Sequence, residues 1–304
     1  MGYAIETKGL CKTYGGKSVV SQLDLKVPEG SVYGFIGPNG AGKSTTMKML
    51  LGLVHPTGGS VTLLGRQMNE KNRLDLLRQT GSLIESTSCY GHLTARENLH
   101  IVADLKGTST QEIDRVLRIV HLDKEEKKVR AFSLGMKQRL GIAQALMGEP
   151  KLLILDEPTN GLDPAGIQEM RELISSLPEI CGATVLISSH LLSELEQFIN
   201  QVGVIGQGKL LFQGEMDQLR RSSQDGVMLR VLCEQRAKET LDCLGIRAEP
   251  IEGGLYLPNL EDEALSEVVS ALCLNGAGVV QVQRRTRSLE EIFFGLTAGK
   301  EGLA

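Results

Sequence analysis

The sequence predicts an α/β fold with a mainly parallel sheet, followed by a smaller α+β domain. Short apolar runs at 152–155 and 184–187 are typical of buried parallel strands, and a helical pattern around 167–177 lies between them. Another short strand at 31–36 runs into a glycine-rich loop and then into a helix at 46–51. Strands that alternate with helices in this way favour a parallel sheet covered by helices.

The other segments of the first two thirds of the chain add strands and a helical region. Residues 3–27 read as two or three short strands with a turn at 14–17, and further strands are expected at 61–64 and 82–84. From Thr94 to about Met147 the pattern is helical, because apolar residues recur at three- and four-residue spacing, as in Ile113, Val116, Leu117 and Val120.

A polar stretch at 222–226 separates the last part of the chain from the rest, and we place a domain boundary there, giving domains at 1–222 and 227–304. Four strands and two helices are expected after it, which makes a small α+β domain; a ferredoxin-like arrangement is one option. The expected strands are 227–233, 246–251, 255–257 and 279–283, and the expected helices are 237–244 and 263–274.

Composition excludes several classes of protein. The 304 residues carry 33 Lys and Arg against 37 Asp and Glu, a net charge of −4, and only five Tyr, six Phe and no Trp, so a general nucleic-acid-binding surface is not indicated. No apolar run approaches the roughly 18 residues of a membrane span, and no signal peptide opens the chain. Six scattered cysteines without a C-x-x-C pair favour reduced thiols in the cytosol.

Residues 37–44 match the phosphate-binding P-loop pattern, G-x-x-x-x-G-K-S, between a strand and a helix. The glycines allow main-chain N–H groups to converge, and the helix N-terminus adds partial positive charge. Lys43 is expected to reach the β- and γ-phosphates of a nucleoside triphosphate, and Ser44 to ligate Mg²⁺. The predicted nucleotide-binding residues of this loop are Gly37, Asn39, Gly40, Ala41, Gly42, Lys43, Ser44 and Thr45.

Two adjacent carboxylates, Asp156 and Glu157, follow the apolar strand at 152–155. At the carboxyl edge of a parallel sheet both can point into the nucleotide crevice. Asp156 suits Mg²⁺, through a water, and Glu157 suits the general base that orients the attacking water.

Three stretches together resemble the ATP-binding subunit of an ABC transporter over about residues 3–220: the P-loop, FSLGMKQR at 132–139 and DEPTNGLD at 156–163. The resemblance implies an ABC-type ATPase core that binds ATP and Mg²⁺. It also implies an antiparallel β part and a helical subdomain at about 90–147. Leu134 and Met136 stand where the family usually has glycine and glutamine, so the middle stretch is degenerate.

The resemblance also assigns roles to single residues. Ser133 and Gly135 belong to the signature motif that caps the γ-phosphate of a partner subunit's ATP. Tyr14 resembles the aromatic residue that stacks on adenine, and Asp163 the acid of the loop that faces the partner cassette. His190, after the strand at 184–187, resembles the switch histidine that contacts the γ-phosphate.

Glu85 departs from the common pattern, because most of the family has glutamine at this hinge. Glutamate here resembles the subgroup that protects producers from lantibiotics, and GHLTARENL at 91–99 resembles the bacitracin-export type. We expect Glu85 to contribute an oxygen to the Mg²⁺ site.

The expected function is ATP hydrolysis that drives export or removal of a peptide antibiotic through separate membrane permease subunits. Two copies would sandwich two ATP molecules, and the subunit would sit on the cytoplasmic face of the membrane. The alternatives are an unrelated transport substrate, or an ABC-type ATPase of nucleic acid or ribosomes. Against the latter, the chain has one P-loop, and only 90 positions separate Lys43 from Ser133, too few for a coiled coil. A P-loop helicase or small GTPase does not account for residues 133–139 or His190.

Overall fold

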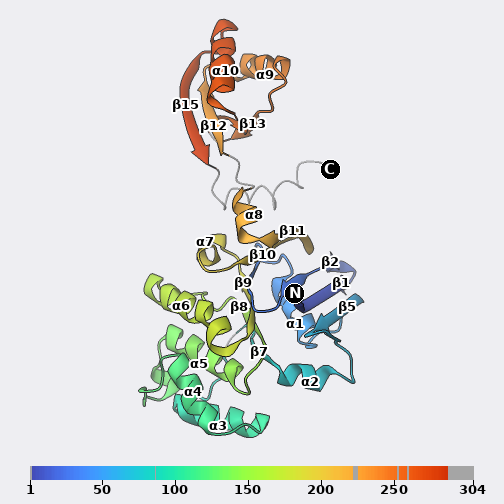
Figure 1. Cartoon of the computed structure of the whole chain (residues 1–304), viewed down its shortest axis with the longest axis vertical. Coiled ribbons are helices and arrows are strands. Elements are labelled where there is room, and N and C mark those ends of the chain that lie inside the picture. Colours follow the sequence, from blue (N-terminus) through green and yellow to red (C-terminus); the bar gives the residue numbers. More distant parts are fainter. Residues whose placement is uncertain (1, 86, 222–224, 252, 259, 287–304) are drawn as a thin grey trace. The chain divides into compact units, whose positions relative to one another are not determined.

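The computed structural model describes residues 2–85, 87–221, 225–251, 253–258 and 260–286 (Figure 1). The chain divides into two compact units: one extends from the N-terminus to Met216 and the other begins at Asp217. The predicted boundary at 222–226 stays a prediction, since 222–224 lie outside the described residues. No helix in the described ranges is long and apolar enough to cross a membrane.

A six-stranded sheet forms the centre of the first unit, in the order β11-β10-β4-β9-β8-β7. All neighbours are parallel except β10 and β11, which form an antiparallel pair. Every residue of β4, β8 and β9 is buried, as expected of strands covered on both faces. The strands are β4 (Val32–Ile36), β7 (Thr80–Leu83), β8 (Leu152–Asp156), β9 (Thr184–Ser189), β10 (Gln201–Gly206) and β11 (Lys209–Glu215).

A second, antiparallel sheet has the order β2-β1-β5-β6, with β3 paired to β1. Its strands are β1 (Tyr3–Tyr14), β2 (Lys17–Leu23), β3 (Lys26–Pro28), β5 (Gly58–Leu63) and β6 (Arg66–Gln67). The first two are joined at Gly15 and Gly16, both with positive φ, which explains the glycine pair at this turn. One apolar core joins this sheet to the central one; it includes Ile5, Leu63 and Leu186.

Helices of the first unit either flank the central sheet or form the predicted helical region. α1 (Lys43–Leu50) follows β4, α2 (Arg73–Arg78) precedes β7, and α6 (Pro164–Cys181) lies between β8 and β9. The helical region contains α3 (Ala95–Lys106), α4 (Gln111–Ile119), a short 3₁₀ turn (Val129–Ala131) and α5 (Leu134–Leu146). A short helix, α7 (Leu192–Leu195), follows β9. Helix α8 (Met216–Arg221) begins at Met216 and continues into the residues assigned to the second unit.

The second unit is an α+β fold with its own core. Its elements are β12 (Asp225–Val231), α9 (Glu234–Cys243), β13 (Glu249–Ile251), β14 (Gly254–Pro258), α10 (Asp262–Leu274) and β15 (Val279–Thr286). The sheet is antiparallel in the order β13-β14-β12-β15, so the β-α-β-β-α-β chain order is that of a ferredoxin-like arrangement. The strand expected at 246–251 begins only at Glu249, although Ile246 packs against the core from the preceding loop.

Candidate functional site

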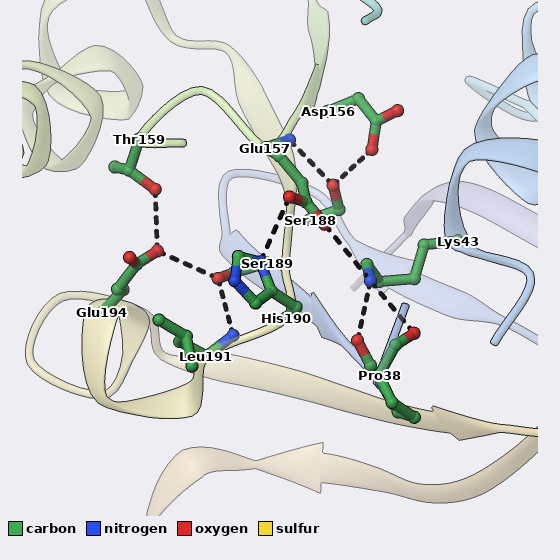
Figure 2. A network of polar contacts seen from close by, with 11 residues as sticks. Pro38, Lys43, Asp156, Glu157, Thr159, Ser188, Ser189, His190, Leu191 and Glu194 are labelled. Carbon is green, nitrogen blue, oxygen red and sulfur yellow. Dashed lines mark hydrogen bonds and ion pairs between the residues drawn. The ribbon is translucent and has the colours of Figure 1, made fainter. Parts of the chain in front are cut away.

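The carboxyl ends of β4, β8 and β9 place three sequence-distant loops at one edge of the central sheet. Asp156 lies opposite Ser188, and Ile36 lies opposite Ser189 in the strand register. The chain therefore leaves the three strands at the same level, and Lys43, Glu157 and His190 come together there (Figure 2). This edge is where α/β sheets bind ligands.

The loop after β4 has a backbone path that only glycine fits at two positions. A Cβ at Gly37 would lie 2.4 Å from the carbonyl oxygen of Ile205, and one at Gly42 would lie 2.8 Å from that of Val19. Gly42 also has φ +107°, and α1 begins at the next residue. The loop thus leads directly into a helix N-terminus, whose N–H groups and dipole favour an anion.

Lys43 is a buried cation in this loop, with an exposed side-chain fraction of 4%. Its Nζ donates to the carbonyl oxygens of Gly37 at 2.7 Å and Pro38 at 3.4 Å, and lies 3.3 Å from Glu157 Oε1. A buried ammonium beside a helix N-terminus is suited to the charge of a phosphate chain, so the loop fits the predicted nucleotide.

The two carboxylates after β8 occupy different environments. Asp156 is buried, and its Oδ1 accepts from Ser188 Oγ at 2.5 Å. Glu157 has φ +46°, a left-handed conformation that costs free energy for a residue other than glycine. Its main-chain N–H donates to Ser188 Oγ at 2.9 Å, and its Oε2 lies 3.1 Å from His190 Nδ1. The Glu157 carboxylate therefore bridges Lys43 and His190 (Figure 2).

Several polar residues of this network were not expected from the sequence. Ser188 links Asp156 to the Glu157 main chain, and Glu194 accepts hydrogen bonds from Thr159 and Ser189. The available signal is weak: small hydroxyl residues end one buried strand, at Ser188 and Ser189, and another, Thr159, lies three positions beyond the end of β8. Buried polar side chains at such places need partners.

Glu85 follows β7, whose Leu83 lies opposite Leu155 of β8, so its loop starts next to the one that carries Glu157. It has φ +65°, and its Oε1 accepts from Lys48 Nζ of α1 at 2.5 Å. This hydrogen bond raises the pKa of Lys48, with smaller contributions from the charges of Glu85, Asp156 and Tyr14. The ion pair was not expected from the sequence.

Tyr14 ends β1, and its side chain is 48% exposed. Lys12 Nζ lies 4.7 Å from the centre of its ring. The ring is exposed, and its predicted stacking on adenine stays a prediction.

Ser133 and Gly135 make their contacts in α5 and with the loop that follows β8. Ser133 caps α5 by accepting from the main-chain N–H of Met136 at 3.2 Å, and a Cβ at Gly135 would lie 3.7 Å from Leu162 Cδ2. Within the part of the chain that the structure describes, neither residue hydrogen-bonds to Lys43. The signature stretch thus adjoins the loop that ends at Asp163, which caps α6 by accepting from Gly166.

The predicted metal ligands offer the oxygen atoms that Mg²⁺ prefers, a buried carboxylate at Asp156 and a hydroxyl at Ser44 on α1. The described residues contain no group of three or more His, Cys, Asp or Glu able to hold a metal. Mg²⁺ commonly takes only one or two protein ligands and completes its shell with water and substrate phosphates, so this donor set suits a nucleotide-bound magnesium ion.

Comparison with protein families matches residues 20–160 to the family described as ABC transporter. The bacitracin transport ATP-binding protein BcrA of Bacillus licheniformis is 51% identical over 226 residues, 74% of each chain. The BcrA protein of Enterococcus faecalis is 40% identical over 98% of both chains. The lantibiotic transport ATP-binding protein SrtF of Streptococcus pyogenes is 47% identical over 70% of this chain and 91% of its own.

Solved structures of similar fold include two that share at least 25% sequence identity with this chain. One is the ATP-binding subunit of an ABC transporter, with 32% identity, a TM-score of 0.63, and coverage of 72% of this chain and 92% of that one. Another is cbiO1 of Clostridium perfringens, part of the complex cbiONQ, with 25% identity, a TM-score of 0.67, and coverage of 72% and 91%. A dimeric cassette bound to ADP and Pi shares the fold at 23% identity, with a TM-score of 0.63 and coverage of 70% and 98%.

Proposed function

This chain belongs to the family of ABC transporter ATP-binding subunits, and we propose that it hydrolyses ATP to drive export or removal of a peptide antibiotic through separate membrane subunits. The predicted family and fold class are confirmed. The substrate class rests on relatives named for bacitracin and lantibiotic transport, one of which matches 98% of this chain.

The observation that carries the proposed chemistry is the position of the Glu157 carboxylate. One of its oxygens lies 3.3 Å from Lys43 Nζ, and the other lies 3.1 Å from His190 Nδ1. When bound, Mg-ATP supplies the reacting γ-phosphoryl group and the divalent charge that stabilises it. Lys43 and the main-chain N–H groups of residues 37–44 hold the phosphates. Because Lys43 then turns from Glu157 to phosphate, one oxygen of Glu157 becomes available to orient and deprotonate the attacking water.

His190 keeps Glu157 in place during this exchange. Its Nδ1 is within hydrogen-bond distance of Glu157 Oε2, so this oxygen has a partner even when Lys43 binds phosphate. Asp156 and Ser44 would hold the magnesium ion, directly or through water, and Glu85 would add a third oxygen from the neighbouring loop. Tyr14 would stack on the adenine.

The proposed partners are a second copy of this chain and integral membrane subunits. Bound to those subunits, this chain would lie at the cytoplasmic face of the membrane. Ser133 and Gly135 would cap the nucleotide of the second copy, and Asp163 would face it across the interface. Among the described contacts, Ser133 is bonded within α5 and Gly135 adjoins Leu162, and neither residue hydrogen-bonds to Lys43, which supports this arrangement. A related cassette that shares the fold was solved as a dimer.

The test is protection of a sensitive bacterium by this chain expressed with its candidate permease. Wild type is expected to raise the inhibitory concentration of bacitracin or a lantibiotic, and Glu157→Gln is expected to abolish the effect at equal protein level. A structurally unrelated antibiotic serves as the control. Hydrolysis without protection against either peptide would refute the substrate class and leave the ATPase assignment intact.

A further inference from the structure

One carboxylate oxygen joins the two loops that carry Glu157 and His190. Glu194 Oε2 accepts from Thr159 Oγ1 at 2.8 Å and from Ser189 Oγ at 3.0 Å (Figure 2). Thr159 is 2% exposed and Ser189 1%, so neither hydroxyl has ready access to water. Removing the carboxylate would leave two buried donors to find other partners.

The three residues lie close in sequence to the groups of the proposed reaction. Thr159 is two positions after Glu157, and Ser189 directly precedes His190. Ser189 Oγ also accepts from the main-chain N–H of Leu191 at 3.0 Å. The segment that carries His190 is therefore held on both sides by one serine, and Glu194 ties that serine to the loop after Glu157.

Pairing between β8 and β9 does not extend to Glu157 and His190, although Ser189 still pairs with Ile36 of β4. The register between β8 and β9 ends at Asp156 and Ser188, so the relative position of Glu157 and His190 depends on contacts beyond the sheet. Glu157 also has a left-handed φ of +46°, a conformation that persists only where the surroundings hold it.

We propose that Glu194 is a positioning residue, which sets the distance between the Glu157 carboxylate and the His190 ring through its paired hydrogen bonds to Thr159 and Ser189. The inference rests on the proposed ATPase function. Since a displacement of about 1 Å in a catalytic group can cost about 100-fold in rate, loss of the link should slow hydrolysis more than it weakens nucleotide binding.

The same segment has a second anchor that serves as a matched control. Arg171 of α6 donates to Gln197 Oε1 and to the carbonyl oxygen of Ser193, both at 3.1 Å. It holds α7 and the following turn but does not contact Thr159 or Ser189 in the described network. Arg171→Met therefore loosens the segment and leaves the carboxylate link in place.

The experiment measures steady-state ATP hydrolysis, ATP affinity and thermal unfolding of the full-length variants. Glu194→Leu is expected to lower kcat by about 10- to 100-fold with an ATP dissociation constant within about twofold of wild type. Glu194→Gln keeps an oxygen that can accept hydrogen bonds from both hydroxyls and should retain most of the wild-type rate. Arg171→Met should lower the unfolding temperature without a comparable loss of kcat.

A double variant separates positioning from general loosening. If Glu194 acts through Glu157, Glu194→Leu should add little to the loss caused by Glu157→Gln, because the two act as a unit. Should Glu194→Leu not fold, Thr159→Val removes one of the two hydrogen bonds to Glu194, and Ser189→Ala removes the other together with the bond from the Leu191 N–H. Each variant should lower kcat.

An unchanged kcat in Glu194→Leu, or in both Thr159→Val and Ser189→Ala, would overturn the inference. Equal losses of kcat in Glu194→Leu and Arg171→Met would overturn it as well. If Glu157→Gln itself hydrolyses ATP normally, the proposed function fails instead. If Glu157→Gln loses turnover as expected and Glu194→Leu keeps its kcat, only the positioning role of Glu194 is refuted.

Discussion

Replacing Glu85 with glutamine tests a predicted ligand of the Mg²⁺ site that the structure pairs with Lys48. The side chain of Glu85 pairs with Lys48 Nζ at 2.5 Å, and their exposed fractions are 67% and 31%. Glu85→Gln keeps the shape and one hydrogen-bond acceptor but removes the charge. The variant therefore distinguishes the contribution of the charge from that of packing. The charge acts in the ion pair and in any contact with Mg²⁺ or a membrane subunit.

From the structure we expect Glu85→Gln to have a small effect on the stability of the protein and on ATP hydrolysis by the purified subunit. Two unit charges at about 4 Å attract by about 1 kcal/mol in water and about 4 kcal/mol at an effective dielectric of 20. Because Glu85 is mostly exposed, the lower value applies, and measured surface pairs contribute about 0.2–1 kcal/mol. The unfolding temperature should fall by at most about 4 °C, and turnover should change by less than about threefold.

We expect the larger consequence in cells. Glu85 lies on the loop between β7 and α3, where the helical region begins, so we expect its charge to matter for coupling to the permease. In cells with the cognate permease, Glu85→Gln should weaken protection against bacitracin or a lantibiotic at equal expression.

The assays are ATP turnover and thermal unfolding of the purified variant, and the inhibitory peptide concentration in complemented cells. Asp75→Asn is the control, because Asp75 forms a comparable exposed ion pair with Arg66 at 3.5 Å. A collapse of turnover in the isolated subunit would make Glu85 catalytic. Full protection by Glu85→Gln would remove the main residue-level support for the proposed substrate class.

Four further predictions follow from the same geometry. Glu157→Gln should lower turnover by roughly 10²–10⁴-fold and accumulate an ATP-bound dimer, seen by size-exclusion chromatography with and without ATP; a monomer that hydrolyses normally would contradict this. Lys43→Ala removes the buried cation of the loop and should abolish ATP binding in calorimetric titration, whereas an unchanged dissociation constant would exclude the assigned role. Gly37→Ala would place a Cβ 2.4 Å from a main-chain oxygen, so it should destabilise the fold by about 1–3 kcal/mol in urea titration; a variant as stable as wild type would show that the loop can shift. A chain truncated before Gln224 should unfold cooperatively and bind ATP, because the first compact unit ends at Met216; loss of cooperative unfolding would show that the tail completes the core.

Much of the architecture could be predicted because the signals are local. The apolar runs before Asp156 and at 184–187 predict buried parallel strands, and β8 and β9 are such strands. The β10–β11 hairpin was missed; its turn depends on Gln207 and Gly208, both with positive φ, and glutamine gives no warning of that conformation. The strand expected at 246–251 was too long at its start, because an apolar residue that packs from a loop looks like one in a strand.

The sequence by itself determined the residue types of the candidate site. Glycine at positions 37 and 42, the lysine after them and the carboxylates after β8 are required by backbone geometry and charge, which act within a few residues and so leave a readable pattern. Their roles remain predictions that the variants above test.

Only the tertiary structure decided which side chains meet. The contacts of Lys43 with Glu157, Lys48 with Glu85, and Glu194 with Thr159 join residues that are far apart in sequence. The order and register of the central strands, or the packing of helices against them, bring these residues together. A pairing of this kind leaves no periodic signal in the sequence, because each partner satisfies its own local rules wherever the other lies. Long-range strand order therefore fixes the distances on which the proposed chemistry depends.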